Sequence, residues 1–200
     1  MIRHLSQNSA WRRMVRPIAI GQRYLSTQVS HTSFPATLLH YCPRQRVRLY
    51  DHAESDDRPD DLVDESAIVE KNGLVYREPP TSHVSNGAVL YPNTFMMQEF
   101  IRMYYDEMLD REDEGKEVET PYIFTIRRGT PIPSHLILIN EYMSRFSLRP
   151  AQALPLQDLN QALNEFFDKH AKKETASGWL DNHPFQNAVA DDALAVWGSH

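Results

Sequence analysis

Residues 122–167 read YIFTIRRGTPIPSHLILINEYMSRFSLRPAQALPLQDLNQALNEFF, and this stretch decides the fold class. Its apolar runs predict strands at Tyr122–Ile126 and His135–Ile139, on either side of the turn-forming segment Arg127–Pro133. A further strand is predicted at Met143–Leu148, followed by a helix that opens at Pro155. The apolar face of that helix follows helical spacing and consists of Leu156, Leu159, Leu163, Phe166 and Phe167.

Upstream of this stretch, the pattern continues with short strands. Phe34–Tyr41 and Arg46–Tyr50 are strand-like and are joined by a segment that contains Cys42-Pro43. The turn signals Asn72-Gly73 and Asn86-Gly87 lead into the short apolar runs Leu74–Tyr76 and Ala88–Tyr91. Short strands at the front and the back of the chain predict an α+β domain rather than a doubly wound sheet.

A first helix is predicted between the two groups of strands. It begins after Pro92-Asn93-Thr94, where Asn93 or Thr94 can cap the free backbone amides. The acidic run Asp106–Glu119 is expected to end this helix and to form an exposed loop. Its buried stripe is expected to consist of Met97, Phe100, Ile101, Tyr104 and Met108.

The charge of the chain changes sharply after residue 50. Residues 1–50 contain eight arginines and no acidic residue, whereas residues 51–200 carry 13 basic and 27 acidic side chains. An arginine-rich, acid-free start with an amphipathic stripe and the cleavage-like sequence Arg23-Tyr24-Leu25-Ser26 is typical of a mitochondrial transit peptide. The alternative is a disordered basic arm that binds nucleic acid or anionic lipid.

These observations predict three parts: a transit peptide at residues 1–25, a domain at 26–171, and a polar C-terminal tail at 172–200 that Trp179 and Trp197 could anchor. The expected location is the mitochondrial matrix. Without residues 1–25 the chain is strongly acidic, which argues against a general nucleic-acid binder. No apolar stretch approaches the length of a membrane span. The acidic runs are expected to be solvated faces, or contacts for a basic partner.

Motifs for the common chemistries are absent from the sequence. The single cysteine, Cys42, excludes a disulfide framework and a thiolate zinc site, and a lone cysteine is more often an apolar filler than a nucleophile. The nine histidines are scattered, so no metal site is predicted. Phosphate-binding glycine loops, GxSxG and HExxH do not occur.

Five blocks in a suggestive order carry a family resemblance: FPATLLHY, NGLVYREPP, NGAVLYPNTFMMQEF, YIFTIRRGTPIPSHLILINEY and RFSLRPAQALPLQDLNQALNEFF. Together they cover residues 34–167 and resemble the ADP-ribosyltransferase-like toxin family of the second type VI secretion effector, in a fungal-type form. The resemblance implies an ADP-ribosyltransferase-like fold of two small packed β-sheets with flanking helices. It also implies NAD as substrate and a protein acceptor or partner. Breaking the nicotinamide–ribose bond requires groups that hold the ribose and stabilise positive charge on the sugar.

The resemblance nominates residues for these tasks. His40, in the first matched strand, is the candidate for holding a ribose hydroxyl or carbonyl, with Tyr76, Asn86 and Gly87 as further cofactor-binding candidates. The catalytic candidates are Glu141 and Arg145. Glu141 is either the carboxylate that stabilises the sugar or a solvated strand-end residue, and Arg145 is either a pyrophosphate ligand or an exposed strand arginine. His40 has the alternative of a satisfied strand histidine.

The chain also departs from the family pattern. Ala88-Val89 stands where the toxins have a Thr-Ser pair, unless Thr81-Ser82 substitutes for it, and Arg145 stands where they have a functional histidine. Two functions therefore stay open: an ADP-ribosyltransferase or NAD glycohydrolase, and a catalytically decayed module that binds a protein partner or senses NAD. A mitochondrial assembly or ribosome-associated factor is a third possibility that the sequence neither favours nor opposes.

Overall fold

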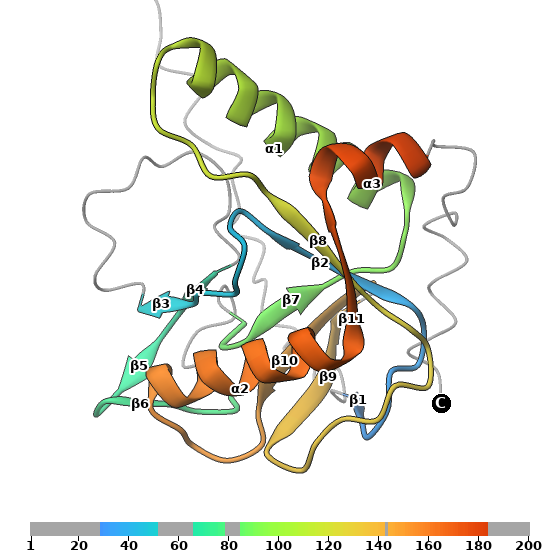
Figure 1. The fold of residues 1–200 in the computed structure, drawn as a ribbon. Helices are drawn as coiled ribbons and strands as arrows, with labels where there is room; N and C mark the ends of the chain where they lie inside the picture. The colour runs from blue at the N-terminus through green and yellow to red at the C-terminus, as the bar shows by residue number, and fades with distance from the viewer. Residues whose placement is uncertain (1–28, 52–65, 79–84, 143, 184–200) are drawn as a thin grey trace, which may run out of the picture.

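The computed structural model describes residues 29–51, 66–78, 85–142 and 144–183. These residues contain three helices and eleven short strands, and no helix among them is both long and apolar enough to cross a membrane. The first and last predicted parts, residues 1–25 and most of 172–200, lie outside this set, as do Thr81-Ser82 and residues 52–65 of the first acidic run. The α+β architecture predicted from the sequence is confirmed (Figure 1).

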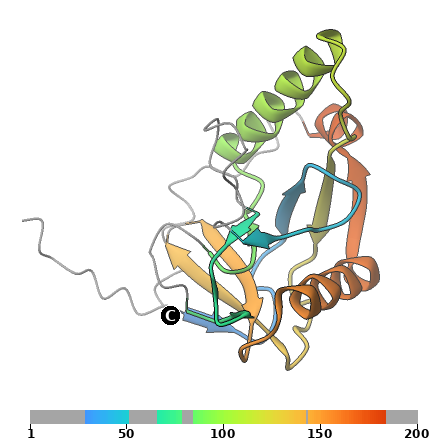
Figure 2. The same ribbon diagram turned by 90° about the vertical axis from the view of Figure 1, so that its left-hand side faces the viewer.

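Two antiparallel sheets form the body of the domain (Figures 1 and 2). The larger sheet has the order β1-β9-β10-β7, and its bounds are β1 Val29–His31, β9 Leu136–Tyr142, β10 Arg145–Pro150 and β7 Ala88–Leu90. The smaller sheet has the order β11-β8-β2, with β11 Ala171–Thr175, β8 Tyr122–Ile126 and β2 Leu38–Cys42. Two minor pairs complete the strands: β3 Tyr50–Asp51 with β4 Ala67–Ile68, and β5 Glu70–Lys71 with β6 Leu74–Val75.

The two sheets meet where β7 passes β2. The amide of Leu39 donates to the carbonyl oxygen of Tyr91 (2.6 Å), and the amide of Tyr91 donates back to Leu39 (2.9 Å). Because side chains alternate between the two faces of a strand, Leu38 and His40 face the opposite side of β2 from Leu39. This junction therefore determines which residues of β2 face the space between the sheets.

The main core lies between the two sheets and is closed by α2 (Leu156–His170). Phe124 and Ile126 from the small sheet and Phe146 and Leu148 from the large sheet meet the apolar face of α2 there. The predicted face of α2 is confirmed for four of its five members, since Leu159, Leu163, Phe166 and Phe167 are buried. Leu156, the fifth, packs against the core while partly buried.

A second core covers the other face of the small sheet. Here α1 (Phe95–Asp113) and α3 (Ala176–Asn182) pack through Met97, Ile101 and Trp179 against Leu39 and Ile123. The predicted cap of α1 is confirmed, because the hydroxyl of Thr94 accepts from the amide of Met97 (3.1 Å). The prediction that the acidic run Asp106–Glu119 forms an exposed loop after α1 is wrong for its first half, Asp106–Asp113, which belongs to the helix. The helix continues to Asp113, since Glu, Met, Leu and Arg favour helix even where they are exposed.

The polar segment after α2 also differs from expectation. Its first residues form the edge strand β11 and the helix α3, and Trp179 is fully buried. Of the two tryptophans expected to anchor this segment, Trp179 does so, and Trp197 lies outside the described residues. The edge strand β11 has the sequence AKKET, which carries lysines and no alternating apolar residues. Its sequence pattern therefore does not predict a strand.

Candidate functional site

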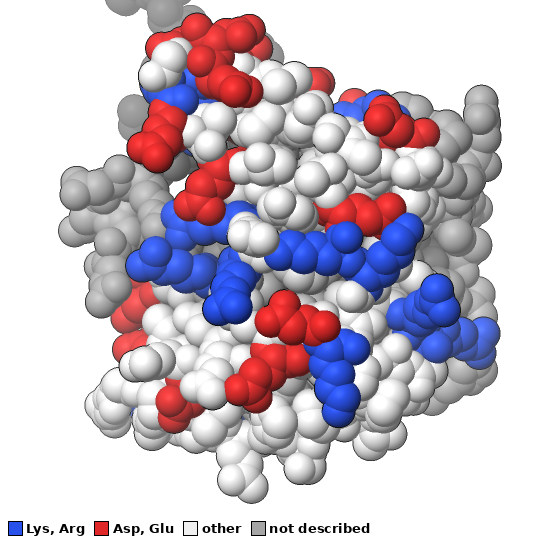
Figure 3. All heavy atoms as spheres, viewed as in Figure 1, with Lys and Arg blue, Asp and Glu red and all other residues white. Residues whose placement is uncertain are grey.

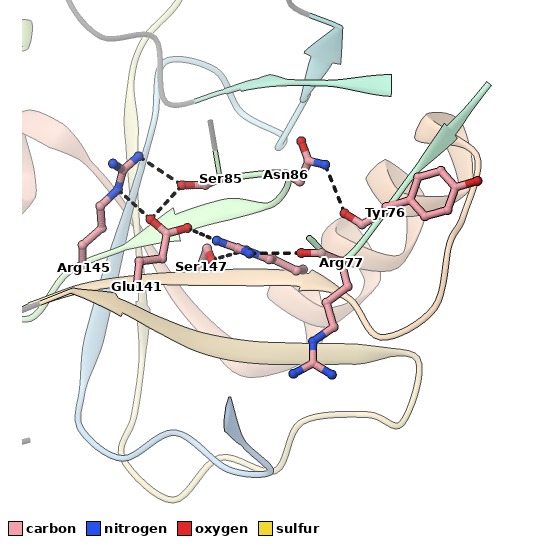
Figure 4. Close-up of polar contacts among 8 residues, drawn as sticks. Tyr76, Arg77, Ser85, Asn86, Glu141, Arg145 and Ser147 are labelled. Carbon is pink, nitrogen blue, oxygen red and sulfur yellow. Dashed lines mark hydrogen bonds and ion pairs between the residues drawn. The ribbon is translucent and has the colours of Figure 1, made fainter. Parts of the chain in front are cut away.

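A cluster of charged and hydroxyl side chains is buried on the face of the large sheet that points away from the main core. We call it the Glu141 cluster; it consists of Ser85, Glu141, Arg145, Ser147 and Arg149 (Figure 4). Since Phe146 and Leu148 face the core, alternation along β10 places residues 145, 147 and 149 on the opposite face. An irregularity between Arg145 and Phe146 interrupts the regular pairing of β10 with β9 beside Glu141.

Both carboxylate oxygens of Glu141 accept hydrogen bonds, and both form ion pairs with arginines. Arg149 donates to Oε1, while Oε2 accepts from Ser85 (3.0 Å) and pairs with Nε of Arg145 (3.2 Å). Burial by itself would raise the pKa of Glu141, but the hydrogen bonds from Arg149 and Ser85 and the charges of both arginines hold it below its usual value. The carboxylate is therefore ionised at neutral pH.

Arg149 is the most deeply buried charged member of the cluster, with 2% of its surface exposed. Its Nε donates to Ser147 (2.7 Å) and one Nη donates to the backbone carbonyl of Arg77 (3.0 Å). Arg145 donates to Ser85 (3.1 Å), so the two arginines together fix Glu141 from two sides. With two guanidinium groups and one carboxylate, the cluster carries a net positive charge, which suits an anionic ligand.

The structure thus brings the two predicted catalytic residues, Glu141 and Arg145, into direct contact. Ser85 and Arg149 were missed by sequence reasoning. The spacing of Arg145, Ser147 and Arg149 at every second position of one strand is a signal that could have identified Arg149. Ser85 comes from a different part of the chain, and its sequence carries no comparable signal.

His40 lies apart from the Glu141 cluster, on β2, and β7 lies between β2 and the cluster strand β10. It is 5% exposed, its Nδ1 is 2.8 Å from the carbonyl oxygen of Val89, and its ring stacks on Phe167. Burial lowers the pKa of His40 to about 4, against the smaller raising effect of the bond to Val89. The imidazole is neutral, and it borders a small cavity lined also by Cys42, Arg44, Arg46, Arg48 and Ser66.

Of the other three cofactor-binding candidates, Asn86 and Gly87 hold neighbouring segments together, and Tyr76 contributes its backbone carbonyl to the same contacts. Asn86, fully buried at φ 46°, bonds through its side chain to both backbone groups of Val69 and to the carbonyl oxygen of Tyr76. Gly87 lies so close to β10 that a Cβ atom there would be 2.3 Å from the carbonyl oxygen of Leu148. Tyr76 is 39% exposed, and its ring points away from Glu141 (Figure 4). A role of these residues in binding NAD stays a prediction.

Two further features bear on the site. Ala88 and Val89, which stand in place of the family's Thr-Ser pair, are buried in β7 and provide no hydroxyl. Burial raises the pKa of the Cys42 thiol to about 11, so it is protonated and a poor nucleophile. Among the described residues, no group of three His, Cys, Asp or Glu side chains is arranged to hold a metal ion.

Comparison with known proteins gives one match. No curated protein and no solved structure matches the chain significantly. The family model described as Tse2 ADP-ribosyltransferase toxin matches residues 36–179, which include both sheets' central strands, the Glu141 cluster and α3 up to Trp179. That range is most of the chain and agrees with the family resemblance of the sequence blocks. The chain therefore belongs to the Tse2 ADP-ribosyltransferase toxin family.

Proposed function

We propose that this domain transfers ADP-ribose from NAD to a protein acceptor, or to water, in the mitochondrial matrix. Family membership supports the activity, and the contact between Glu141 and Arg145 is the observation that carries the assignment of residues. In this proposal the ionised carboxylate of Glu141 stabilises positive charge that develops on the ribose. Arg145, beside it, binds a phosphate oxygen of the dinucleotide through its N–H donors.

The remaining members of the cluster are positioning residues. Arg149 and Ser85 hold the carboxylate of Glu141 ionised and in one orientation, so that no reorganisation is needed when charge develops. His40 is neutral. With Nδ1–H donating to Val89, its Nε2 is an acceptor. Because β7 lies between His40 and the Glu141 cluster, His40 would contact a part of the dinucleotide other than the ribose at Glu141.

The deciding experiment uses the full chain and NAD labelled in the adenylate. Release of nicotinamide and transfer of label to proteins of a matrix extract are measured for the natural sequence and for Glu141→Gln. Loss of a transition-state carboxylate is expected to lower the rate by at least about 100-fold. Glu117→Gln, which removes one exposed charge from the loop after α1, is the matched control. Equal rates for the natural chain and Glu141→Gln would remove Glu141 from the mechanism.

A catalytically decayed binding module is the second candidate. It is favoured by the saturation of Glu141, whose two oxygens already accept from Arg149, Ser85 and Arg145, and by the burial of His40. Calorimetry with NAD separates the candidates. Binding without nicotinamide release supports an NAD sensor, whereas a stable protein partner without NAD binding supports an interaction module.

The mitochondrial location rests on the acid-free, arginine-rich residues 1–25. A carboxy-terminal fluorescent fusion of the full chain is expected to accumulate in the matrix. Replacement of Arg12, Arg13 and Arg16 by glutamate is expected to leave it outside, because import requires a basic amphipathic segment. A fusion that is matrix-localised in both forms would contradict the assignment.

A further inference from the structure

The chain between β2 and β3 presents three arginines on one face. Val47 and Leu49 are buried (3% and 2% exposed), and Arg46 and Arg48 alternate with them and are exposed. In an extended segment, residues two apart point to the same side, as Arg46 and Arg48 do. Arg44 lies in the bend at residues 43–46 and lines the same cavity as these two arginines. This segment was predicted as the strand Arg46–Tyr50. It has the alternation of a strand, although only Tyr50 and Asp51 pair with another strand.

Helix α2 takes the place of the missing partner strand. Asn164 accepts from the amide of Val47 (3.0 Å) and donates to its carbonyl oxygen (2.8 Å). Asn160, one turn earlier, makes the same pair of bonds to Leu49 (2.8 and 3.0 Å). The backbone that carries the arginines is thus held along α2 by four hydrogen bonds, which orders it before any ligand binds.

The three arginines surround a cavity of about 40 Å³ whose other walls include His40, Cys42 and Ser66. This volume admits a few water-sized groups and is too small for a nucleobase or a nicotinamide ring. His40 and Cys42 are uncharged at neutral pH, so the arginines determine the charge of the cavity. Within the part of the chain that the structure describes, only Arg44 of the three has a carboxylate partner, Glu119 at 3.5 Å.

Lys173 adds a fourth positive charge next to this loop. Its ammonium group donates to the carbonyl oxygen of Gln45 and lies over the ring of Tyr122, 4.5 Å from the centroid. Figure 3 shows a band of basic side chains across one face of the molecule, between acidic regions above and below it. Such a band is unexpected on a chain whose residues 51–200 contain 27 acidic and 13 basic side chains.

We propose that Arg44, Arg46 and Arg48 form a phosphate-binding site that takes a phosphoryl or pyrophosphoryl group of a small ligand. Guanidinium groups match phosphate oxygens through paired N–H donors, and three of them on one ordered segment around a phosphate-sized cavity provide the needed charge. The site goes beyond the proposed function, because β7 lies between it and β10, the strand that carries three members of the Glu141 cluster.

The test measures binding of inorganic pyrophosphate to the full chain by calorimetry at low ionic strength. The triple variant Arg44→Gln, Arg46→Gln, Arg48→Gln is expected to bind at least about tenfold more weakly, because three charge-assisted contacts are lost. The matched control replaces three exposed arginines elsewhere, Arg111, Arg127 and Arg128, with glutamine and is expected to bind as the natural chain does. Circular dichroism checks that each variant folds. If the triple variant does not fold, the single variant Arg46→Gln, at an exposed position, is used instead, and it is expected to weaken binding about threefold.

Equal weakening in both triple variants would show a general charge effect and overturn the site. Absence of pyrophosphate binding by the natural chain would also overturn it. A single-stranded RNA oligonucleotide is titrated in parallel, and binding of RNA without binding of pyrophosphate would equally contradict a site for a small phosphorylated ligand. A competition arm with NAD identifies the source of the phosphate: displacement of pyrophosphate assigns the site to the dinucleotide, and no displacement assigns it to another phosphorylated ligand. Glu141→Gln is expected to retain pyrophosphate binding, so failure of the catalytic proposal and failure of this one are distinguishable.

Discussion

The imidazole of His40 donates from Nδ1 to the carbonyl oxygen of Val89 across 2.8 Å, which links the small sheet to the large one. Val89 belongs to the edge strand β7, and the bond lies beside the backbone pair of Leu39 and Tyr91. A residue nominated by its position as a ligand for NAD therefore also joins the two halves of the core. Its charge state consequently affects the stability of the fold.

Stability is expected to fall as the pH drops from 6.5 towards 4. The folded chain holds His40 neutral with a pKa of about 4, whereas the unfolded chain takes up a proton near 6.5, so protons favour unfolding in that window. Between about pH 7.5 and pH 5 the free energy of unfolding should decrease by about 2 kcal/mol on account of this residue. Urea titrations at the two pH values measure the change.

His40→Leu is the control, because it cannot bind a proton. It should lose most of the pH dependence, with a smaller part remaining from His31, whose pKa burial also lowers. An unchanged slope in His40→Leu would mean that another group causes it.

Glu141→Gln is expected to destabilise the domain by about 3 kcal/mol, since it leaves two buried guanidinium groups without their carboxylate. Combining it with Arg149→Gln should cost at least about 1 kcal/mol less than the sum of the single changes, because the two residues are coupled. Chemical denaturation of the natural chain, the two single variants and the double variant measures the four free energies of unfolding. Glu117→Gln should stay within about 0.5 kcal/mol of the natural chain, and strict additivity would contradict the coupling.

Gly87→Ala is expected to lower the free energy of unfolding by about 2–3 kcal/mol, because its Cβ would overlap the backbone of β10 at Leu148. Gly73→Ala is the comparison. Gly73 has φ 73° but open space around it, so only backbone strain of about 1 kcal/mol is expected. Thermal unfolding ranks the two variants, and a smaller loss for Gly87→Ala than for Gly73→Ala would show that β7 and β10 can move apart.

Asn164→Ala is expected to cost about 2 kcal/mol, since both backbone groups of Val47 lose their partner. Hydrogen exchange at the Val47 amide should accelerate more than exchange elsewhere in the domain. Gln161→Ala changes an exposed amide of the same helix, one that bonds only to Glu165 among the described contacts, and should have an effect within about 0.5 kcal/mol. Similar exchange rates at Val47 in both variants would show that α2 does not hold the arginine segment.

Periodicity located the larger elements well. The apolar alternation of Tyr122–Ile126 matches β8 residue for residue, and the helical stripe after Pro155 matches α2. Such patterns are reliable because a face buried against a core must repeat with the period of its element. Two strands of the large sheet were found with errors of a few residues at their ends, since β9 extends to Tyr142 and β10 to Pro150. The edge strand β1, Val29–His31, was not predicted.

Other contacts have no local signature. The pairing of Val47 and Leu49 with asparagines of α2 joins positions more than one hundred residues apart, and only an asparagine already placed by the fold can provide it. In the candidate site, the sequence nominated Glu141 and Arg145, while Arg149 and Ser85 were missed. Ser85 contacts Glu141 because the fold places the segment before β7 next to the end of β9, and no spacing along the chain indicates this contact.

By itself, the sequence determined the α+β class, the main helices and strands, the family and two members of the Glu141 cluster, because these depend on local periodicity and on motif order. Only the tertiary structure decided that His40 is a neutral link between sheets, that Glu141 is clamped by two arginines, and that three arginines of one segment surround a single cavity. The physical reason is that burial and charge coupling depend on what lies across the fold from a residue, and distance along the chain does not encode it.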